Sequence, residues 1–170
     1  METFTMDRIG TVVSTRGAAI DDDWDSVVSR IELDAARVDA DATLGLDAFS
    51  HIEVVFVFDR VDPGDVCRGS RHPRGNTDWP RVGILAQRAK DRPNRIGVTT
   101  CRVVHVDGRT IDVEGLDAVD GTPVLDVKPT LAGFAPRGET YEPGWAGELM
   151  AGYWRHDEAD PTVSRDEGVS

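Results

Sequence analysis

The side chains in this sequence with the clearest capacity for chemistry are basic ones, concentrated in residues 68–97. This segment holds eight basic residues against two aspartates, a net charge of +6, in a chain of 170 residues whose formal charge is −12, so that the remainder carries −18. The eight are Arg68, Arg71, Arg74, Arg81, Arg88, Lys90, Arg92 and Arg95. A concentrated basic segment on an acidic chain indicates a face that binds an anion. The alternative is that these side chains pair with nearby Asp and Glu and serve only the fold.

A second group of polar residues forms a predicted turn, which consists of Asp120, Gly121, Thr122 and Pro123. Such a turn presents backbone N–H groups, a hydroxyl and one carboxylate together. It is suited to bind a polar ligand, for example a ribose or the amino-acid end of a cofactor. Considered alone it is equally well explained as a purely structural turn.

Other polar residues carry weaker signals. His51 precedes the most apolar strand of the chain, where a histidine is more often structural than catalytic. The three consecutive aspartates at 21–23 lack the alternating ligands and distal Glu of a calcium loop, so a solvated acidic turn is predicted. Cys67 and Cys101 have no CxxC spacing, and GxSxG, HExxH, Walker and GxGxxG motifs are absent. We therefore predict no metal site and reduced thiols.

Length and composition predict one globular domain in residues 1–156. The chain is 39% hydrophobic and 29% charged, which is typical of soluble proteins. No apolar run approaches the roughly 20 residues of a membrane-spanning helix. The first ten residues lack the apolar run of a signal peptide, so a cytoplasmic protein is expected. Residues 157–170 are polar, and a disordered tail is expected there.

Short β-branched runs separated by turn residues predict about seven strands and an all-β fold. In the clearest strand, residues 51–58, the side chains of Ile52, Val54, Phe56 and Phe58 share one face, and its other face is also largely apolar, as in a central strand. The Asp107-Gly108 dipeptide predicts a hairpin. One helical turn within 34–45 and a helix over 143–154 complete the elements. Because long helices do not alternate with the strands, we predict a small β-barrel with a short C-terminal helix.

Several blocks of this sequence occur in an order that resembles one known family. The blocks are LDAFSHIEVVFVF, HPRG, QRAKDRPNRIG and GLDAVDGTPVLDVKP. Over residues 8–145 the chain is similar to the TsaA-like (TrmO) family. The resemblance implies a β-barrel methyltransferase that uses S-adenosylmethionine, works as a homodimer and methylates N6 of N6-threonylcarbamoyladenosine beside the anticodon of tRNA.

The resemblance also assigns roles to residues of this chain. The cofactor-binding residues would be Phe58, Asp59, Arg88, Val98, Asp120, Gly121, Thr122 and Pro123. The tRNA-binding residues would be Arg71, His72, Arg74, Arg92, Asn94 and Lys128. Because N6 has to lose a proton, a carboxylate is expected to act as general base. Asp120 is the candidate for this catalytic role, and its alternative roles are to hold the turn or the cofactor.

The chain departs from the family pattern at four places, one of which is the C-terminal GWAGELMAGYW at residues 144–154, and this indicates a divergent subfamily. Family members carry a Pro-Arg-Gln triplet that touches the cofactor in the loop after the first strand, where this chain has Asp23 and Trp24. The core strand ends in Phe58-Asp59 instead of Phe-His, and Arg95 stands in place of a proline. Asp59 or Asp23 could favour the cationic sulfonium. Two alternatives stay open, a methyltransferase acting on a small anionic metabolite and a non-catalytic module that binds S-adenosylmethionine or RNA.

Overall fold

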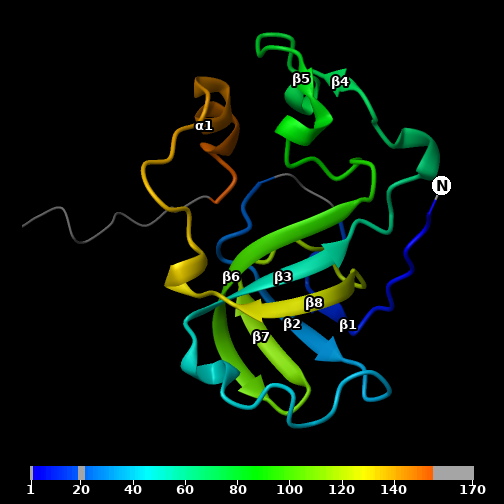
Figure 1. Cartoon of the computed structure of the whole chain (residues 1–170), viewed down its shortest axis with the longest axis vertical. Helices are drawn as coiled ribbons and strands as arrows, with labels where there is room; N and C mark the ends of the chain where they lie inside the picture. The colour runs from blue at the N-terminus through cyan, green and yellow to red at the C-terminus, as the bar shows by residue number, and fades with distance from the viewer. Residues whose placement is uncertain (1, 19–21, 155–170) are drawn as a thin grey trace, which may run out of the picture.

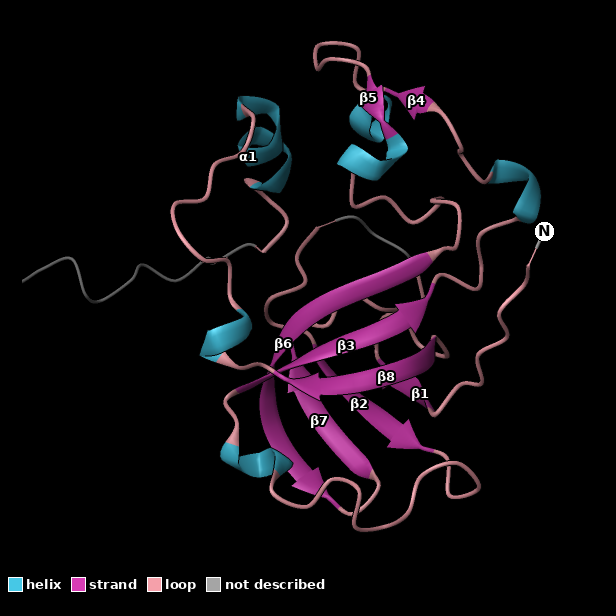
Figure 2. Ribbon diagram, viewed as in Figure 1, coloured by secondary structure: helices cyan, strands magenta, loops and turns pink. Residues whose placement is uncertain are grey.

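Six antiparallel strands close into a barrel in the computed structural model, which describes residues 2–18 and 22–154 (Figures 1 and 2). The strands follow one another around the barrel in the order β1-β2-β7-β6-β3-β8. Their bounds are β1 Gly10–Ser14, β2 Val28–Leu33, β3 His51–Val57, β6 Ile96–Asp107, β7 Thr110–Glu114 and β8 Pro123–Pro129. Closure leaves no barrel strand with an unpaired edge.

The remaining elements are short. A two-stranded sheet pairs β4 (Ser70–Arg71) with β5 (Val82–Gly83), and α1 spans Gly144–Met150. Five single 3-10 turns lie at Leu46–Ala48, Pro63–Asp65, Pro73–Gly75, Ile84–Ala86 and Ala132–Phe134. The small sheet and α1 both lie beyond the same end of the barrel (Figure 1). That end is therefore covered by the basic segment and by the C-terminal part of the described chain.

The barrel interior is filled by the alternate side chains of its strands. On β3, Ile52, Val54 and Phe56 are at most 1% exposed, whereas Val55 and Val57 on the other face are half-buried. The interior is completed by Val12, Ile31, Cys101, Ile111, Val113, Leu116, Ala118 and Val124. The period of two in the sequence of this strand therefore corresponds to the inside and outside of the barrel.

The all-β prediction is confirmed, with differences in detail. Six predicted strands form the barrel, and two strands of two residues each are added by the basic segment. The predicted helical turn within 34–45 is present as a single turn, in which the Val38 N–H donates to the Asp34 carbonyl at 2.9 Å, and no longer helix forms there. The hairpin is confirmed, but the strand pair Asp107–Thr110 leaves Gly108 and Arg109 as its loop, with φ of 53° at Gly108.

The C-terminal predictions are tested only as far as residue 154. A helix is present there, but α1 is shorter than the predicted 143–154. The predicted tail at 157–170 lies outside the described residues. Within the described ranges, the chain contains no helix long and apolar enough to cross a membrane.

Candidate functional site

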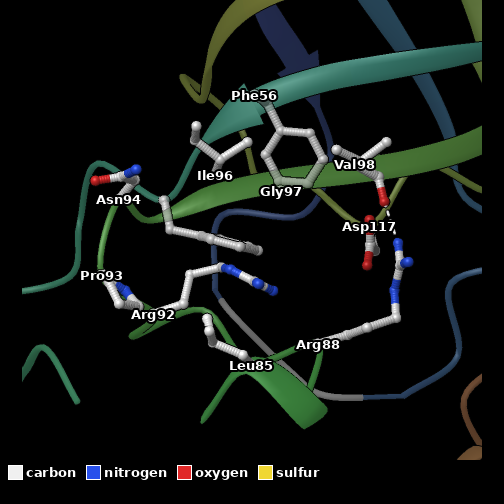
Figure 3. Close-up of a pocket in the computed structure, with 11 residues that line it drawn as sticks. Phe56, Leu85, Arg88, Arg92, Pro93, Asn94, Ile96, Gly97, Val98 and Asp117 are labelled. Carbon is white, nitrogen blue, oxygen red and sulfur yellow. Dashed lines mark hydrogen bonds between the residues drawn. The ribbon is translucent and has the colours of Figure 1, made fainter. Parts of the chain in front are cut away.

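A cavity of about 430 Å³ opens where β3 ends and β6 begins (Figure 3). Its volume lies in the range of sites for small molecules and cofactors. The lining residues are Phe56, Phe58, Leu85, Arg88, Arg92, Pro93, Asn94, Ile96, Gly97, Val98 and Asp117. They come from the ends of two paired strands, from the basic segment that connects these strands, and from the segment between β7 and β8.

The connection between β3 and β6 builds the cavity. The last strand pair is Val57–Ile96, so the intervening chain leaves the barrel and returns at the same end. The Phe58 N–H donates to the Arg95 carbonyl at 2.8 Å and closes the base of this excursion. The stretch between these points contains the 3-10 turn Ile84–Ala86, whose Leu85 lies 77% exposed at the cavity. An excursion anchored at both ends thus lies over one end of the barrel.

Aromatic and glycine residues form the apolar part of the cavity. The rings of Phe56 and Phe58 meet edge to face, with centroids 5.2 Å apart and planes at 78°. At Gly97 a Cβ atom would overlap the Phe56 ring, so this position on β6 has to be a glycine if the ring keeps its place. Apolar surface of this kind is suited to the flat face of a base.

Three polar side chains from the basic segment complete one side of the cavity. The Arg88 guanidinium donates to the Val98 carbonyl on β6 and remains exposed. Arg92 donates to the Gln87 carbonyl at 3.3 Å and is half-buried, while Asn94 is exposed. A guanidinium has five N–H donors, so each arginine keeps donors for a ligand anion.

Asp117 is a cavity residue that sequence reasoning missed. Its carboxylate accepts hydrogen bonds from the Thr99 hydroxyl and, at 2.5 Å, from the Tyr153 hydroxyl. Burial, and then the negative charge of Asp117, raise the pKa of Tyr153 above its ordinary value, so this tyrosine remains a donor. The available signal was its position in the GLDAVDGTP block, next to the more conspicuous turn.

The structure brings five of the predicted site residues to this cavity. They are Phe58, Arg88, Arg92, Asn94 and Val98. Predicted cofactor-binding residues and predicted tRNA-binding residues thus lie at one cavity. Their positions in the sequence did not show whether they would be neighbours. Asp59 is exposed and is not among the residues that line the cavity.

The predicted turn Asp120, Gly121, Thr122 and Pro123 does not line the cavity and is bound instead to the end of β1. The Gly121 N–H donates to the Val12 carbonyl at 2.8 Å, and the Val12 N–H donates to the Thr122 carbonyl at 3.0 Å. The Asp120 Oδ1 atom accepts the Ser14 N–H at 3.0 Å. These bonds fit the structural alternative for the turn, and the ligand roles of its residues stay predictions.

Arg60 clamps the same turn from outside. One guanidinium nitrogen donates to the Asp120 carbonyl at 2.5 Å and another to the Gly17 carbonyl at 2.6 Å. The clamp joins the loop after β1 to the turn before β8. The backbone of the turn is therefore held from both sides.

Two arginines predicted to bind phosphate are engaged by carboxylates. Arg71 forms an ion pair with Asp91, whose side chain is 13% exposed. Arg74 pairs with Asp22 at 3.0 Å. For these two, the alternative stated for the basic segment describes the structure. The side chains of Arg71 and Arg74 nevertheless remain 39% and 29% exposed, so they are not sealed from solvent.

Two further predicted tRNA residues have other surroundings. The Nδ1 atom of His72 is 2.7 Å from the Trp79 carbonyl and donates to it. Lys128 pairs with Asp126 and lies opposite Glu53 in the strand register. That position is roughly 17 Å along β8 from its first residue at 3.3–3.4 Å per residue. Lys128 is therefore not brought together with the cavity.

The loop after β1 replaces the family triplet with a packed aromatic side chain. Trp24 is 4% exposed, and the Arg16 guanidinium lies 4.3 Å from its ring. The backbone N–H of Trp24 donates to the Tyr153 carbonyl at 3.2 Å. Asp22 is half-buried and ion-paired, so the prediction of a solvated turn is wrong for that aspartate, while residues 19–21 lie outside the described part. Among the described residues no cluster of His, Cys, Asp and Glu could hold a metal ion.

Comparison with known proteins was made at the level of sequence and of fold. The family model of the tRNA-methyltransferase O N-terminal domain matches residues 19–134. A tRNA (adenine(37)-N6)-methyltransferase of Escherichia coli is 40% identical over 112 residues, which cover 62% of this chain and 46% of that protein. A protein of Archaeoglobus fulgidus named "Probable S-adenosyl-L-methionine-binding protein" is 35% identical over 89 residues, 52% of this chain and 23% of its own length.

The fold has counterparts among solved structures. A crystal structure of TrmO from Pseudomonas aeruginosa superposes with a TM-score of 0.68 and 25% sequence identity, over 85% of this chain and 63% of that one. The chain thus spans less than half of the two curated relatives and less than two thirds of this structural relative.

Proposed function

Because this chain belongs to the tRNA-methyltransferase O N-terminal domain family, we propose that it transfers a methyl group from S-adenosylmethionine to N6 of an adenosine beside the anticodon of tRNA. The finer assignment is N6-threonylcarbamoyladenosine as the acceptor. The observation that carries the proposal is that every residue lining the cavity lies within the matched residues 19–134. The cavity therefore belongs to the part of the chain that the family shares.

The chemistry of the cavity fits S-adenosylmethionine. This cofactor has a flat adenine, ribose hydroxyls, a carboxylate and two cationic groups, the ammonium and the sulfonium. The half-buried Phe58, packed edge to face on the buried Phe56, offers apolar surface for the base, Arg88 offers donors for the carboxylate, and Asp117 offers a negative charge. Ligand sites commonly combine a mostly apolar lining with a few polar groups that fix orientation.

The chain's own contribution to the reaction is alignment and proton removal. Bound S-adenosylmethionine supplies an activated methyl group, and holding it in line with the acceptor nitrogen is worth roughly 7–11 kcal/mol. The N6 proton has to leave, and a carboxylate within hydrogen-bond reach serves as its acceptor. Asp120 is the proposed base: the Ser14 N–H holds its Oδ1 atom, which orients Oδ2 of this exposed side chain.

We propose that the basic segment binds tRNA phosphates beside the cavity. Arg92 and Asn94 line the cavity, and the ion-paired Arg71 and Arg74 have partly exposed side chains. Arginine offers several donors to one phosphate, so an existing ion pair does not exclude this role. A homodimer in the cytoplasm is part of the proposal, since two such faces would together oppose the repulsion from the acidic remainder of the chain.

Mass spectrometry of tRNA nucleosides from a strain lacking the gene tests the proposal. We expect N6-methylated threonylcarbamoyladenosine to disappear and its unmethylated form to accumulate. Restoring the wild-type gene should restore the methyl group, and restoring the Arg88→Ala variant should do so less well. An unchanged nucleoside profile in the deletion strain would overturn the tRNA assignment.

A further inference from the structure

The cavity has one negative charge. Among the described residues that line it, Asp117 is the single acidic side chain, beside Arg88 and Arg92. Figure 3 shows Asp117 on the same side of the cavity as the Arg88 guanidinium and the Val98 carbonyl that it binds. A cavity with both signs of charge is suited to a zwitterionic ligand, because each end of such a ligand then meets the opposite charge.

Two hydroxyl groups fix the Asp117 carboxylate, one on each oxygen. Thr99 on β6 is 4% exposed and donates to Oδ1, and Tyr153 donates to Oδ2 at 2.5 Å. Because Tyr153 has a raised pKa, its hydroxyl keeps its proton under ordinary conditions. Hydroxyl donors replace the hydrogen bonds to water that a half-buried carboxylate loses, and they add no charge of their own.

The second donor comes from outside the family domain. Tyr153 follows α1 and lies beyond the matched residues 19–134. Its carbonyl accepts the Trp24 N–H, and the Arg74 guanidinium lies 5.9 Å from its ring. On α1 itself, Glu148 accepts the Trp79 indole N–H at 2.7 Å. The C-terminal segment thus contacts the loop after β1 and the connection between β4 and β5, in addition to Asp117.

We propose that Asp117 binds a cationic group of S-adenosylmethionine, its ammonium or its sulfonium, and that Tyr153 is the positioning residue that orients the carboxylate. This inference rests on the proposed use of S-adenosylmethionine. It extends the site beyond the shared domain, because Tyr153, outside residues 19–134, then orients a side chain of a cavity that the shared part of the chain lines.

Calorimetry on the full chain with three ligands tests the role of Asp117. S-Adenosylmethionine has both cationic groups, S-adenosylhomocysteine has only the ammonium, and 5′-methylthioadenosine has neither. In Asp117→Asn we expect the affinity for S-adenosylmethionine to fall about 10- to 100-fold, as for loss of a charged hydrogen bond. The affinity for 5′-methylthioadenosine should stay unchanged. Asp112→Asn removes a carboxylate bound by Arg30 on the outside of the barrel and serves as the control.

The two adenosyl ligands identify the cationic group. An equal loss for S-adenosylmethionine and S-adenosylhomocysteine indicates the ammonium, and a loss for S-adenosylmethionine alone indicates the sulfonium. Either result supports the proposal. Unchanged binding of all three ligands, or an equal loss of all three, overturns it while the proposed function stands. If the wild-type chain binds none of them, the proposed function fails and this inference fails with it.

The positioning role has a separate test that does not alter the charge. Tyr153→Phe removes only the hydroxyl, and we expect the KM for S-adenosylmethionine to rise about 3- to 10-fold with little change in kcat. Trp79→Phe removes the hydrogen bond from the Trp79 indole to Glu148 of this segment and should leave KM unchanged. Equal effects of both variants would mean a structural role and overturn the assignment. If Asp117→Asn does not fold, this pair of variants decides the question.

Discussion

The turn at residues 120–123 and the cavity wall at Asp117 are neighbours in sequence but differ in how their polar groups are used. In the turn, the backbone and one carboxylate oxygen are bound by β1 and by Arg60. At the cavity wall, Asp117 is held by two hydroxyl groups and still lines open space. The comparison indicates that a conspicuous polar turn can be engaged by the fold, whereas a less conspicuous neighbouring side chain faces the cavity.

The comparison has an energetic consequence. A buried or half-buried polar group that loses its partner costs about 1–3 kcal/mol, whichever function it serves. Substitutions in the turn should therefore lower the free energy of unfolding, and substitutions at the wall should lower ligand affinity. The four predictions below test this division, from the largest expected effect on stability to the smallest.

Gly97 should be an exception, because it belongs to the cavity wall, yet its substitution should lower stability through the core. In Gly97→Ala the new Cβ atom would overlap the Phe56 ring, and overpacking of this kind costs about 1–3 kcal/mol. Chemical denaturation should show this loss of unfolding free energy. Gly83→Ala is the control, since a Cβ there meets no atom within 4 Å. Equal stability of the two variants would show that Phe56 moves aside freely.

The loss of stability at alkaline pH should have two separable contributions, one from a group in the barrel core and one from a group at the cavity end. Burial raises the pKa of the Cys101 thiol to about 12 from 9.0, and the pKa of Tyr153 is also raised. A raised pKa means that stability is complete below the ordinary value and is lost as the pH rises through the folded value. Each group should contribute a loss of up to about 1.4 kcal/mol per pH unit.

The two groups can be resolved by unfolding at a series of pH values. Cys101→Ala should flatten the decline that begins near pH 9, the ordinary value of the thiol. Tyr153→Phe should flatten only the part above pH 10. If neither variant changes the slope, both groups are accessible to water in the folded state and the described burial is incorrect.

The Asp120→Ala variant compares the turn with Asp117 in its effects on stability and on ligand affinity. Loss of the carboxylate leaves the Ser14 N–H without its partner, so the free energy of unfolding should fall by about 1 kcal/mol. The affinity for S-adenosylmethionine should change less than in Asp117→Asn. The same variant tests the proposed base, because removal of a general base should lower kcat by about 10²- to 10⁴-fold. A normal kcat with reduced stability would leave Asp120 a purely structural role.

On the surface, the basic segment 68–97 shows the same contrast between polar side chains that are bound by the fold and polar side chains that are not. Arg71 and Arg74 are bound by carboxylates, whereas Arg68 and Lys90 are exposed and, within the described part of the chain, form no ion pair. Arg68→Glu with Lys90→Glu should therefore leave stability almost unchanged. If both residues contact phosphates in the single-stranded anticodon loop of tRNA, the slope of the logarithm of the binding constant against the logarithm of the salt concentration should become less steep by about 1.4. Filter binding at several salt concentrations measures this slope, and an unchanged slope would place the tRNA elsewhere.

Local sequence signals predicted much of this fold. The alternation in residues 51–58 predicted which side chains of β3 are buried, because successive side chains of a strand point to opposite faces. The Asp107-Gly108 signal predicted the hairpin, because its turn geometry depends on neighbouring residues alone. The ordered blocks indicated the family, and five predicted site residues line the cavity.

Only the tertiary structure decided which polar groups are free for a ligand. Asp120 binds an N–H group 106 residues away, and Asp117 binds Tyr153 36 residues away. No local pattern encodes such partners, since they depend on barrel closure and on where the excursion between β3 and β6 and the C-terminal segment come to lie. The sequence by itself determined the strands, their inward faces and the family. Whether a given aspartate or arginine serves the fold or a ligand was determined by the groups that folding brings within hydrogen-bond distance of it.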